Sequence, residues 1–140
     1  MSELLAERLR ERILRHEFMP GTDMDEVALL KEYGVSRTPV REALKLLHHE
    51  GLLTAKHRRG MAVTVLSETE VHEAREMFDS LNRYAQYHPT YMHFPRSLLR
   101  QMLSMVEQRL RLAYGLEFDS LRRGTETAAV PPPTNLHESQ

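Results

Sequence analysis

Three cationic side chains recur at intervals of four residues within the segment GVSRTPVREALKLLHHEGLL, residues 34–53. Arg37, Arg41 and Lys45 would share one face of a helix, because four residues make slightly more than one helical turn. Two guanidinium groups one turn apart can direct paired N–H donors at the O6 and N7 acceptors of guanine in the major groove. The residue types and their spacing therefore predict a helix that reads double-stranded DNA.

The same helix has an apolar face and a polar beginning. Side chains at the spacing of a core-facing stripe are Val40, Ala43, Leu44 and Leu47. Ser36 or Thr38 can cap the first turn, and Pro39 is tolerated there because its missing N–H would have no intrahelical partner. The free N–H groups of that turn and the hydroxyls of Ser36 and Thr38 can donate to phosphate. We expect the helix to end near Glu50, before Gly51.

A basic hairpin is predicted directly after this helix. Residues 52–55 and 61–65 are short strand candidates, and KHRRG between them has the length of a hairpin loop. The loop residues expected at DNA phosphates, in the minor groove or at the turn are Lys56, His57, Arg58, Arg59 and Gly60. From residue 34 to residue 63, six Lys and Arg oppose two Glu, so positive charge gathers here in a chain of net charge −1.

Two further helices are predicted before the cationic one. Leu5, Leu9 and Ile13 mark an amphipathic helix over residues 2–16, and MPGT at residues 19–22 interrupts it. An acidic start favours a second helix over residues 25–33, which Gly34 can end in a left-handed conformation. Three helices followed by a hairpin predict a winged helix-turn-helix, whose last helix enters the major groove.

These motifs resemble the winged helix-turn-helix signature of the GntR family of bacterial transcription regulators, over residues 4–66. A helix directly after the wing resembles the FadR-like branch of that family, which has a helical ligand-binding domain in its second part. The resemblance implies DNA contacts from recognition-helix and wing positions, which here are Ser36, Arg37, Thr38, Arg41, Arg59 and Gly60. Many members of the branch have a DNA-contacting Arg where this sequence has Val27, and Lys31 on the same helix could partly replace it.

The second part of the chain is predicted to contain a short helical pair. Ser67 and Glu70 form a capping box that opens a helix extending to about residue 85. A second helix is expected over residues 96–113, and the proline-rich end of the chain has the composition of a disordered tail. The mainly α-helical chain is therefore expected to comprise a DNA-binding domain at 1–66, a truncated helical dimerisation segment at 67–121 and a tail at 122–140.

The resemblance also implies a ligand site that this sequence does not reproduce. In the FadR-like branch, one Asp and three His often bind a metal beside a small organic acid. The first pair would be an Asp and a His four residues apart, but Arg122 and Glu126, or alternatively Asp119 and Arg123, occupy those positions. We therefore expect no metal, no cofactor and no small-molecule effector.

Other classes of protein are disfavoured by composition. The chain has no cysteine for disulfides or thiolate metal sites, and no apolar run of the roughly 18 residues needed to cross a membrane. It contains no glycine-rich phosphate loop and no hydrolase or zinc-protease motif, so we do not expect an enzyme. A cytoplasmic location fits this composition.

The sequence thus predicts a transcription regulator that binds an inverted-repeat operator in double-stranded DNA as a homodimer. Aromatic and Met side chains near residues 84–94 could cover a small core, or could form a surface that needs a second subunit. Two alternatives remain: a truncated regulator that forms mixed dimers with full-length relatives, and a non-functional remnant.

Overall fold

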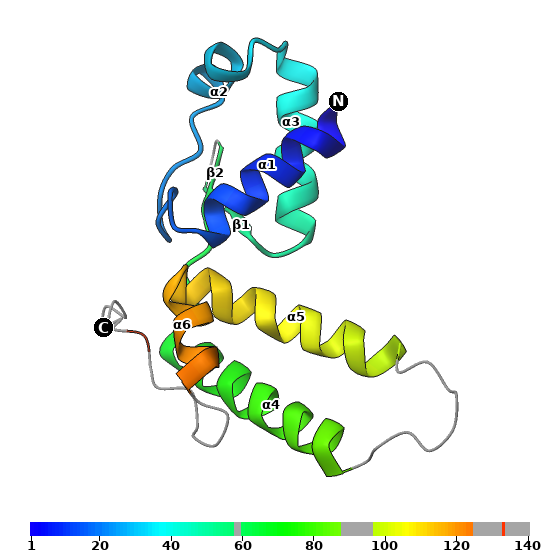
Figure 1. The fold of residues 1–140 in the computed structure, drawn as a ribbon. Coiled ribbons are helices and arrows are strands. Elements are labelled where there is room, and N and C mark those ends of the chain that lie inside the picture. The colour runs from blue at the N-terminus through cyan, green and yellow to red at the C-terminus, as the bar shows by residue number, and fades with distance from the viewer. Residues whose placement is uncertain (58–59, 88–96, 125–132, 134–140) are drawn as a thin grey trace. The chain divides into compact units, whose positions relative to one another are not determined.

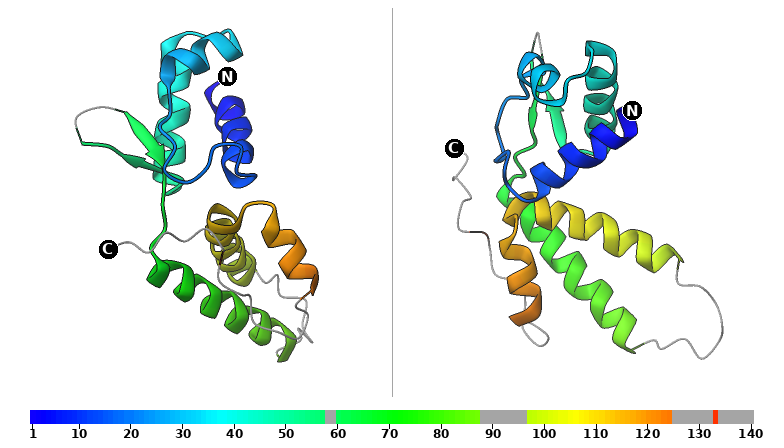
Figure 2. Two further views of the ribbon diagram at one scale, coloured as in Figure 1. Left: turned by 90° about the vertical axis from the view of Figure 1, so that its left-hand side faces the viewer. Right: turned by 45° about the horizontal axis from the view of Figure 1, so that its top comes forward.

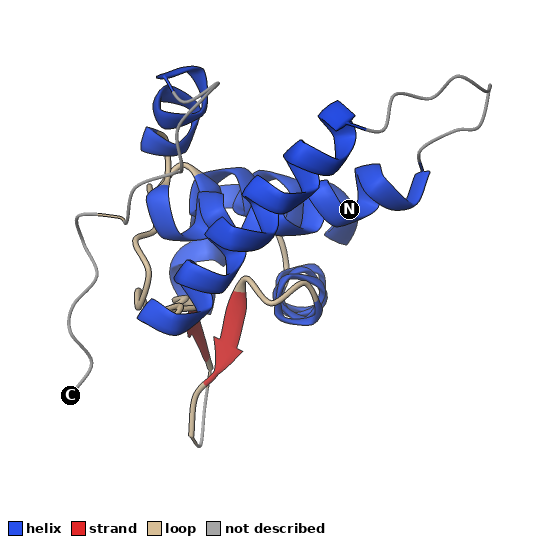
Figure 3. Cartoon of the chain, turned by 90° about the horizontal axis from the view of Figure 1, so that it is seen from below, coloured by secondary structure: helices blue, strands red, loops and turns tan. Residues whose placement is uncertain are grey.

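The computed structural model describes residues 1–57, 60–87, 97–124 and 133 (Figure 1). The chain divides into two compact units, Met1–Val65 and Leu66–Gln140. The described residues form helices and one two-stranded antiparallel sheet, which confirms the predicted mainly helical fold class (Figure 3).

The first unit consists of α1 (Ser2–Leu14), α2 (Glu26–Tyr33), α3 (Arg37–His49), β1 (Leu53–Ala55) and β2 (Met61–Val63). Helices α1 and α2 both pack against α3, and β1 contacts α3 as well. The hairpin of β1 and β2 projects away from the three helices of this unit (Figure 2, left). This order and packing are those of the predicted winged helix-turn-helix.

The core of the first unit lies between α1 and α3. The expected apolar stripe of α1 is buried at Leu5, Leu9 and Ile13. The four apolar residues predicted to face the core from α3 are also buried: Val40, Ala43, Leu44 and Leu47. Burying these side chains supplies the main driving force for folding the unit, at about 1.5–3 kcal/mol for each large aliphatic side chain.

The hairpin is extended by a segment that lies before α2. Leu53 pairs with Val63, and Ala55 pairs with Met61, across β1 and β2. On the other edge of β2, Asp23 forms an isolated antiparallel bridge with Ala62. The backbone N–H of Met24 also donates to the Met61 carbonyl over 2.9 Å. The sequence pattern did not predict this third strand-like segment.

The second unit contains α4 (Glu68–Tyr87), α5 (Ser97–Tyr114) and α6 (Glu117–Gly124). Helices α4 and α5 pack side by side, and α6 packs on α5 (Figures 1 and 2). The predicted capping box is present, since the Glu70 N–H donates to Ser67 Oγ over 3.1 Å and the Ser67 N–H donates to Glu70 Oε1 over 3.4 Å.

Helix α6 was not expected as a separate element, and its last three residues, 122–124, fall within the predicted tail. Gly115 ends α5 in the left-handed region at φ 64°, which lets the chain turn back. Phe118 then inserts its ring into the core of the unit with no exposed surface. In the rest of the predicted tail, only Pro133 is among the described residues. Residues 125–132 and 134–140 lie outside them.

Candidate nucleic-acid interface

Helix α3 separates its apolar and cationic side chains as predicted. The side chains of Arg37, Arg41 and Lys45 are exposed, whereas the apolar stripe of the same helix is buried. Neither Arg37 nor Lys45 has a carboxylate partner among the described residues. Packing against α1 therefore holds one side of α3 rigidly and leaves the cationic side open to solvent.

The N-terminus of α3 is also open to solvent. Ser36 is its N-cap residue, with extended backbone at φ −81° and ψ 176°, and its hydroxyl makes no capping hydrogen bond among the described residues. Thr38 is exposed in the first turn. The first N–H groups of a helix have no intrahelical acceptor, so this end offers donors suited to a phosphate oxygen.

A tight turn sets the position of α3 relative to α2. Gly34 takes the left-handed conformation at φ 62° and ψ 39°, and its N–H donates to the Leu30 carbonyl. Asp25 caps the other end of α2 by accepting a hydrogen bond from the Ala28 N–H over 3.2 Å. The predicted helix ends and the glycine turn are therefore confirmed.

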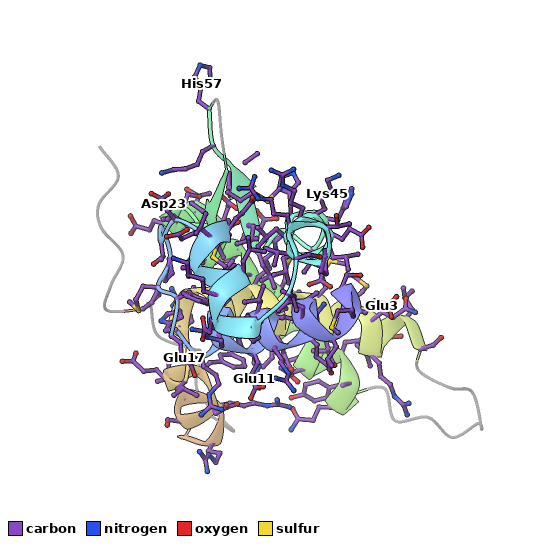
Figure 4. All side chains as sticks on the ribbon, turned by 90° about the horizontal axis from the view of Figure 1, so that it is seen from above. Glu3, Glu11, Glu17, Asp23, Lys45 and His57 are labelled. Atoms are coloured by element: carbon purple, nitrogen blue, oxygen red, sulfur yellow. The ribbon has the colours of Figure 1, made fainter. Side chains whose placement is uncertain are left out.

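The hairpin loop places a second set of polar groups at the end of the sheet. The Lys56 N–H donates to the Gly60 carbonyl over 3.0 Å, and Gly60 takes a positive φ of 80°. His57 is exposed and stands at the far end of the hairpin (Figure 4). Arg58 and Arg59, which were predicted to contact DNA, lie outside the described residues.

Two carboxylates next to these cations were missed at the level of sequence. Glu26 Oε2 accepts a long hydrogen bond of 3.4 Å from Arg41 Nε. Asp23 forms an ion pair with Lys56. Asp23 lies near the base of the hairpin in Figure 4, on the segment that pairs with β2. The strand-like segment brings Asp23 to Lys56, and the packing of α2 on α3 brings Glu26 to Arg41, so helical periodicity could not reveal either contact.

Three further residues of α2 and α3 either make a structural contact or remain exposed. The carbonyl of Leu53 lies 2.8 Å from His48 Nδ1, which joins the end of α3 to β1. Val27, at the position where the resemblance implied an Arg, is 50% exposed, and Lys31 is exposed as well. A cation at position 31 would therefore be free to reach a ligand, while Val27 offers no donor.

Three of the residues at the expected metal positions make other contacts in the second unit, and the fourth, Glu126, lies outside the described residues. Asp119 accepts two hydrogen bonds from Arg111, and Arg122 forms an ion pair with Glu107 over 3.1 Å. Among the residues with described positions, no group of three or more His, Asp or Glu side chains could hold a metal ion. Within that same part of the chain, no helix has the length and apolar character to cross a membrane.

Comparison with known proteins relates the first unit to a family. Residues 1–63 match the family model of bacterial regulatory proteins, gntR family. The uncharacterized HTH-type transcriptional regulator YdhC of Bacillus subtilis (strain 168) is 42% identical over 66 residues, which cover 47% of this chain and 30% of YdhC. The HTH-type transcriptional repressor NanR of Salmonella newport (strain SL254) is 32% identical over 129 residues, which cover 86% of this chain and 49% of NanR.

A solved structure supports the fold of the chain. The crystal structure of a proposed transcriptional regulator GntR from Rhodococcus sp. RHA1 has a TM-score of 0.51 at 19% identity, covering 87% of this chain and 69% of that one. The likeness shows a shared fold. The chain spans less than half the length of each of these two curated relatives.

Proposed function

We propose that this chain, whose residues 1–63 form the winged helix-turn-helix domain of a GntR-family transcription regulator, binds an inverted-repeat operator in double-stranded DNA as a homodimer. Helix α3 would enter the major groove, and the hairpin would lie along the adjacent backbone or minor groove. The chain would then act as a regulator of transcription through occupancy of that operator.

The observation that carries this proposal is the exposed cationic face of α3 above a fully packed apolar face. Arg37 and Arg41 stand one turn apart, and each guanidinium can donate to guanine O6 and N7. Ser36 and Thr38 would fix the register through phosphate contacts, which position a protein without reading sequence. Lys45 would add a phosphate contact further along the helix.

The wing residues would supply affinity with less sequence preference. In the sequence, His57, Arg58, Arg59 and Gly60 fall between β1 and β2, and backbone phosphates would come within reach of this part of the wing. Each phosphate that a cation neutralises releases counterions, so this contribution would fall steeply with salt concentration. Base reading would thus reside in α3, and general affinity in the wing.

Dimerisation would involve the second unit. Large apolar side chains on α4 and α5 remain exposed, among them Met77 at 39%, Tyr84 at 54%, Leu98 at 68% and Met105 at 65%. One winged helix covers less DNA surface than specific regulators usually bury, and a two-fold dimer would double that surface. We therefore assign residues 1–66 to DNA binding and residues 67–121 to dimerisation of a FadR-like type, without a small-molecule effector.

A second role would use the same apolar surface. If α4 and α5 pair with the corresponding helices of a full-length relative, the chain would form mixed dimers and modulate that relative. The 32% identity to NanR extends over 86% of this chain and so includes most of the second unit. This favours a second unit of the kind found in such repressors.

Selection from a random double-stranded DNA library tests the proposed function. We expect the purified chain to enrich an inverted repeat, and sedimentation of the complex to show two chains on each duplex. Enrichment of no sequence over several rounds would reject specific DNA binding. A single chain on each selected duplex, with monomers in free solution at micromolar concentration, would reject the dimer.

A further inference from the structure

The described Lys and Arg side chains of the proposed DNA face are those of Arg37, Arg41, Lys45 and Lys56. Two of these four cations form ion pairs with carboxylates from one short segment. Residues 22–26 supply Asp23 to Lys56 of the wing and Glu26 to Arg41 of α3. All four side chains keep substantial exposure, at 68% for Asp23 and 49% for Lys56, and at 34% for Glu26 and 56% for Arg41. DNA approaching this face would therefore meet these acids as well as the cations.

The segment is held in place by its backbone, so the carboxylates are positioned before DNA arrives. The Val63 N–H donates to the Thr22 carbonyl over 2.8 Å, and the Met24 N–H donates to the Met61 carbonyl over 2.9 Å. Asp25 caps α2, whose first residue is Glu26. The two acids are thus attached to β2 on one side and to a capped helix on the other.

A carboxylate next to a cation competes with a phosphate for the same donor. Non-specific DNA binding depends almost entirely on such phosphate contacts, whereas specific binding also gains from base contacts. An acid on the binding face therefore penalises non-specific complexes more heavily, which is how repulsive groups create specificity.

We propose that Glu26 is a specificity-determining residue that suppresses binding to non-cognate DNA by occupying Arg41, and that Asp23 lowers the general DNA affinity of the wing by occupying Lys56. The inference rests on the proposed function, because it assumes that this face binds DNA.

The geometry at Arg41 favours base reading over phosphate binding. Glu26 accepts a hydrogen bond from Nε of Arg41. The two terminal nitrogens of that guanidinium can then still donate to guanine O6 and N7. A guanine contact can form while the ion pair persists, whereas a phosphate brought to the same side of Arg41 would be repelled by Glu26. The ammonium of Lys56 is a single charged group and has no separate nitrogens left to donate to a base while it pairs with Asp23. Asp23 would therefore act mainly by reducing the contribution of the wing to DNA affinity.

The experiment uses the full chain and a labelled 30-base-pair duplex of random sequence. Fluorescence anisotropy gives the dissociation constant from 50 to 300 mM salt for the parent, Asp23→Asn, Glu26→Gln and the double variant. We expect each single variant to bind random DNA roughly 3- to 10-fold more tightly at 50 mM salt, and each freed cation to steepen the log–log salt slope by about 0.9. For Glu26→Gln the operator affinity should rise less, so the ratio of specific to random affinity should fall, whereas Asp23→Asn should strengthen binding to operator and random DNA alike.

Glu32→Gln is the matched control. Glu32 lies on α2 with Glu26 and pairs over 3.0 Å with Arg12, which is not a residue of the proposed DNA face. The Glu32→Gln substitution should leave the affinity for random DNA unchanged. Thermal unfolding should show that all variants remain folded. An equal gain in the control would overturn the inference, because the effect would then follow net charge alone.

The remaining outcomes separate the inference from the proposed function. If the parent selects an operator but the double variant binds random DNA no more tightly, only the inference is overturned. If neither the parent nor any variant binds DNA at 50 mM salt, the proposed function falls and the inference falls with it.

Discussion

The guanidinium of Arg111 donates hydrogen bonds to both carboxylate oxygens of Asp119, over 3.0 and 2.8 Å. The same guanidinium lies 5.2 Å from the centre of the Phe118 ring. One side chain near the end of α5 therefore holds two consecutive residues of α6. Together with the ion pair between Arg122 and Glu107, this contact links α5 to α6.

Replacing Asp119 with Asn should destabilise the second unit in a pH-dependent way. The hydrogen bonds from Arg111 lower the pKa of Asp119 below its ordinary value, and the positive charges of Arg123 and Arg122 act in the same direction. Because the folded pKa lies below that of the unfolded chain, near 4, the stabilisation is complete above that range and is lost as the pH falls through the folded value. We expect a loss of about 1 kcal/mol at pH 7, since the pair is partly exposed.

Chemical denaturation at pH 7 and at pH 3 measures this difference. The Asn variant should be less stable at pH 7, and the gap from the parent should narrow at pH 3. Glu117→Gln is the control, because Glu117 belongs to the same helix and has no ion-pair partner among the described residues. A gap that stays constant over this pH range would show that the carboxylate charge of Asp119 does not stabilise α6.

Replacing Phe118 with Ala should open the core of the second unit. The ring is fully buried and meets the Phe78 ring edge-on, with the ring centres 5.6 Å apart and the planes at 71°. Removing a buried Phe costs about 3–5 kcal/mol, and the aromatic pair adds specific contact energy to the lost burial. We expect α6 to lose helicity by circular dichroism and amide exchange, and α4 and α5 to become less protected.

Phe18→Ala in the first unit serves as the comparison. Phe18 is half-buried and lies under Arg12, whose guanidinium carbon is 4.2 Å from the ring centre. Its loss should leave amide protection in the second unit unchanged. A Phe118→Ala variant with parent-like denaturation and amide protection would contradict the position of that ring.

The same residues explain why α6 was not predicted. The eight residues Glu117–Gly124 follow a glycine and offer only Phe118 and Leu121 as large apolar side chains, too few to define a periodic stripe. Isolated helices of this length are marginal in water. Helix α6 depends on contacts with Arg111 on the preceding helix and with Phe78, which is distant in sequence, so the pattern within α6 could not reveal it.

Local signals were sufficient where the structure is locally determined. Gly34 ends α2 through its own conformation, and Ser67 and Glu70 cap α4 within four consecutive residues. The candidate site divides in the same way. The exposed cations of α3 follow from helical spacing, whereas Asp23 and Glu26 reach their partners only through tertiary packing.

Replacing Gly34 with Ala should strain the turn between α2 and α3. A Cβ atom at Gly34 would meet no other atom within 4 Å, so the cost comes from the backbone at φ +62° and not from a clash. The left-handed conformation costs a non-glycine residue roughly 1–2 kcal/mol. We expect that loss of stability in the first unit, with faster amide exchange at the end of α2 and the start of α3.

Gly34→Asn separates strain from other effects of adding a side chain. Asn tolerates the left-handed region better than Ala, so its cost should be smaller. The prediction is wrong if Ala and Asn destabilise the first unit equally, since the two residues differ mainly in their tolerance of positive φ.

Replacing Arg41 with Ala should remove sequence discrimination more than general affinity for DNA. Arg41 is exposed on α3, one turn from Arg37, and its terminal guanidinium nitrogens can reach a guanine in the major groove. Losing one such contact should cost about 1–3 kcal/mol on the selected operator and relax selectivity at one base pair in each half-site. Titration of operator variants that differ at single base pairs gives both quantities.

Arg58→Ala provides the contrasting variant, and Arg15→Ala provides the control for loss of one positive charge. Arg58 is expected at phosphates, so its loss should weaken binding to operator and random DNA alike and flatten the salt slope by about 0.9. Arg15 pairs with Glu11 on α1, and its loss should change neither affinity appreciably. If Arg41→Ala weakens operator and random duplexes by the same factor, Arg41 contacts phosphate, and base reading must then rest on Arg37 or on another residue of the face.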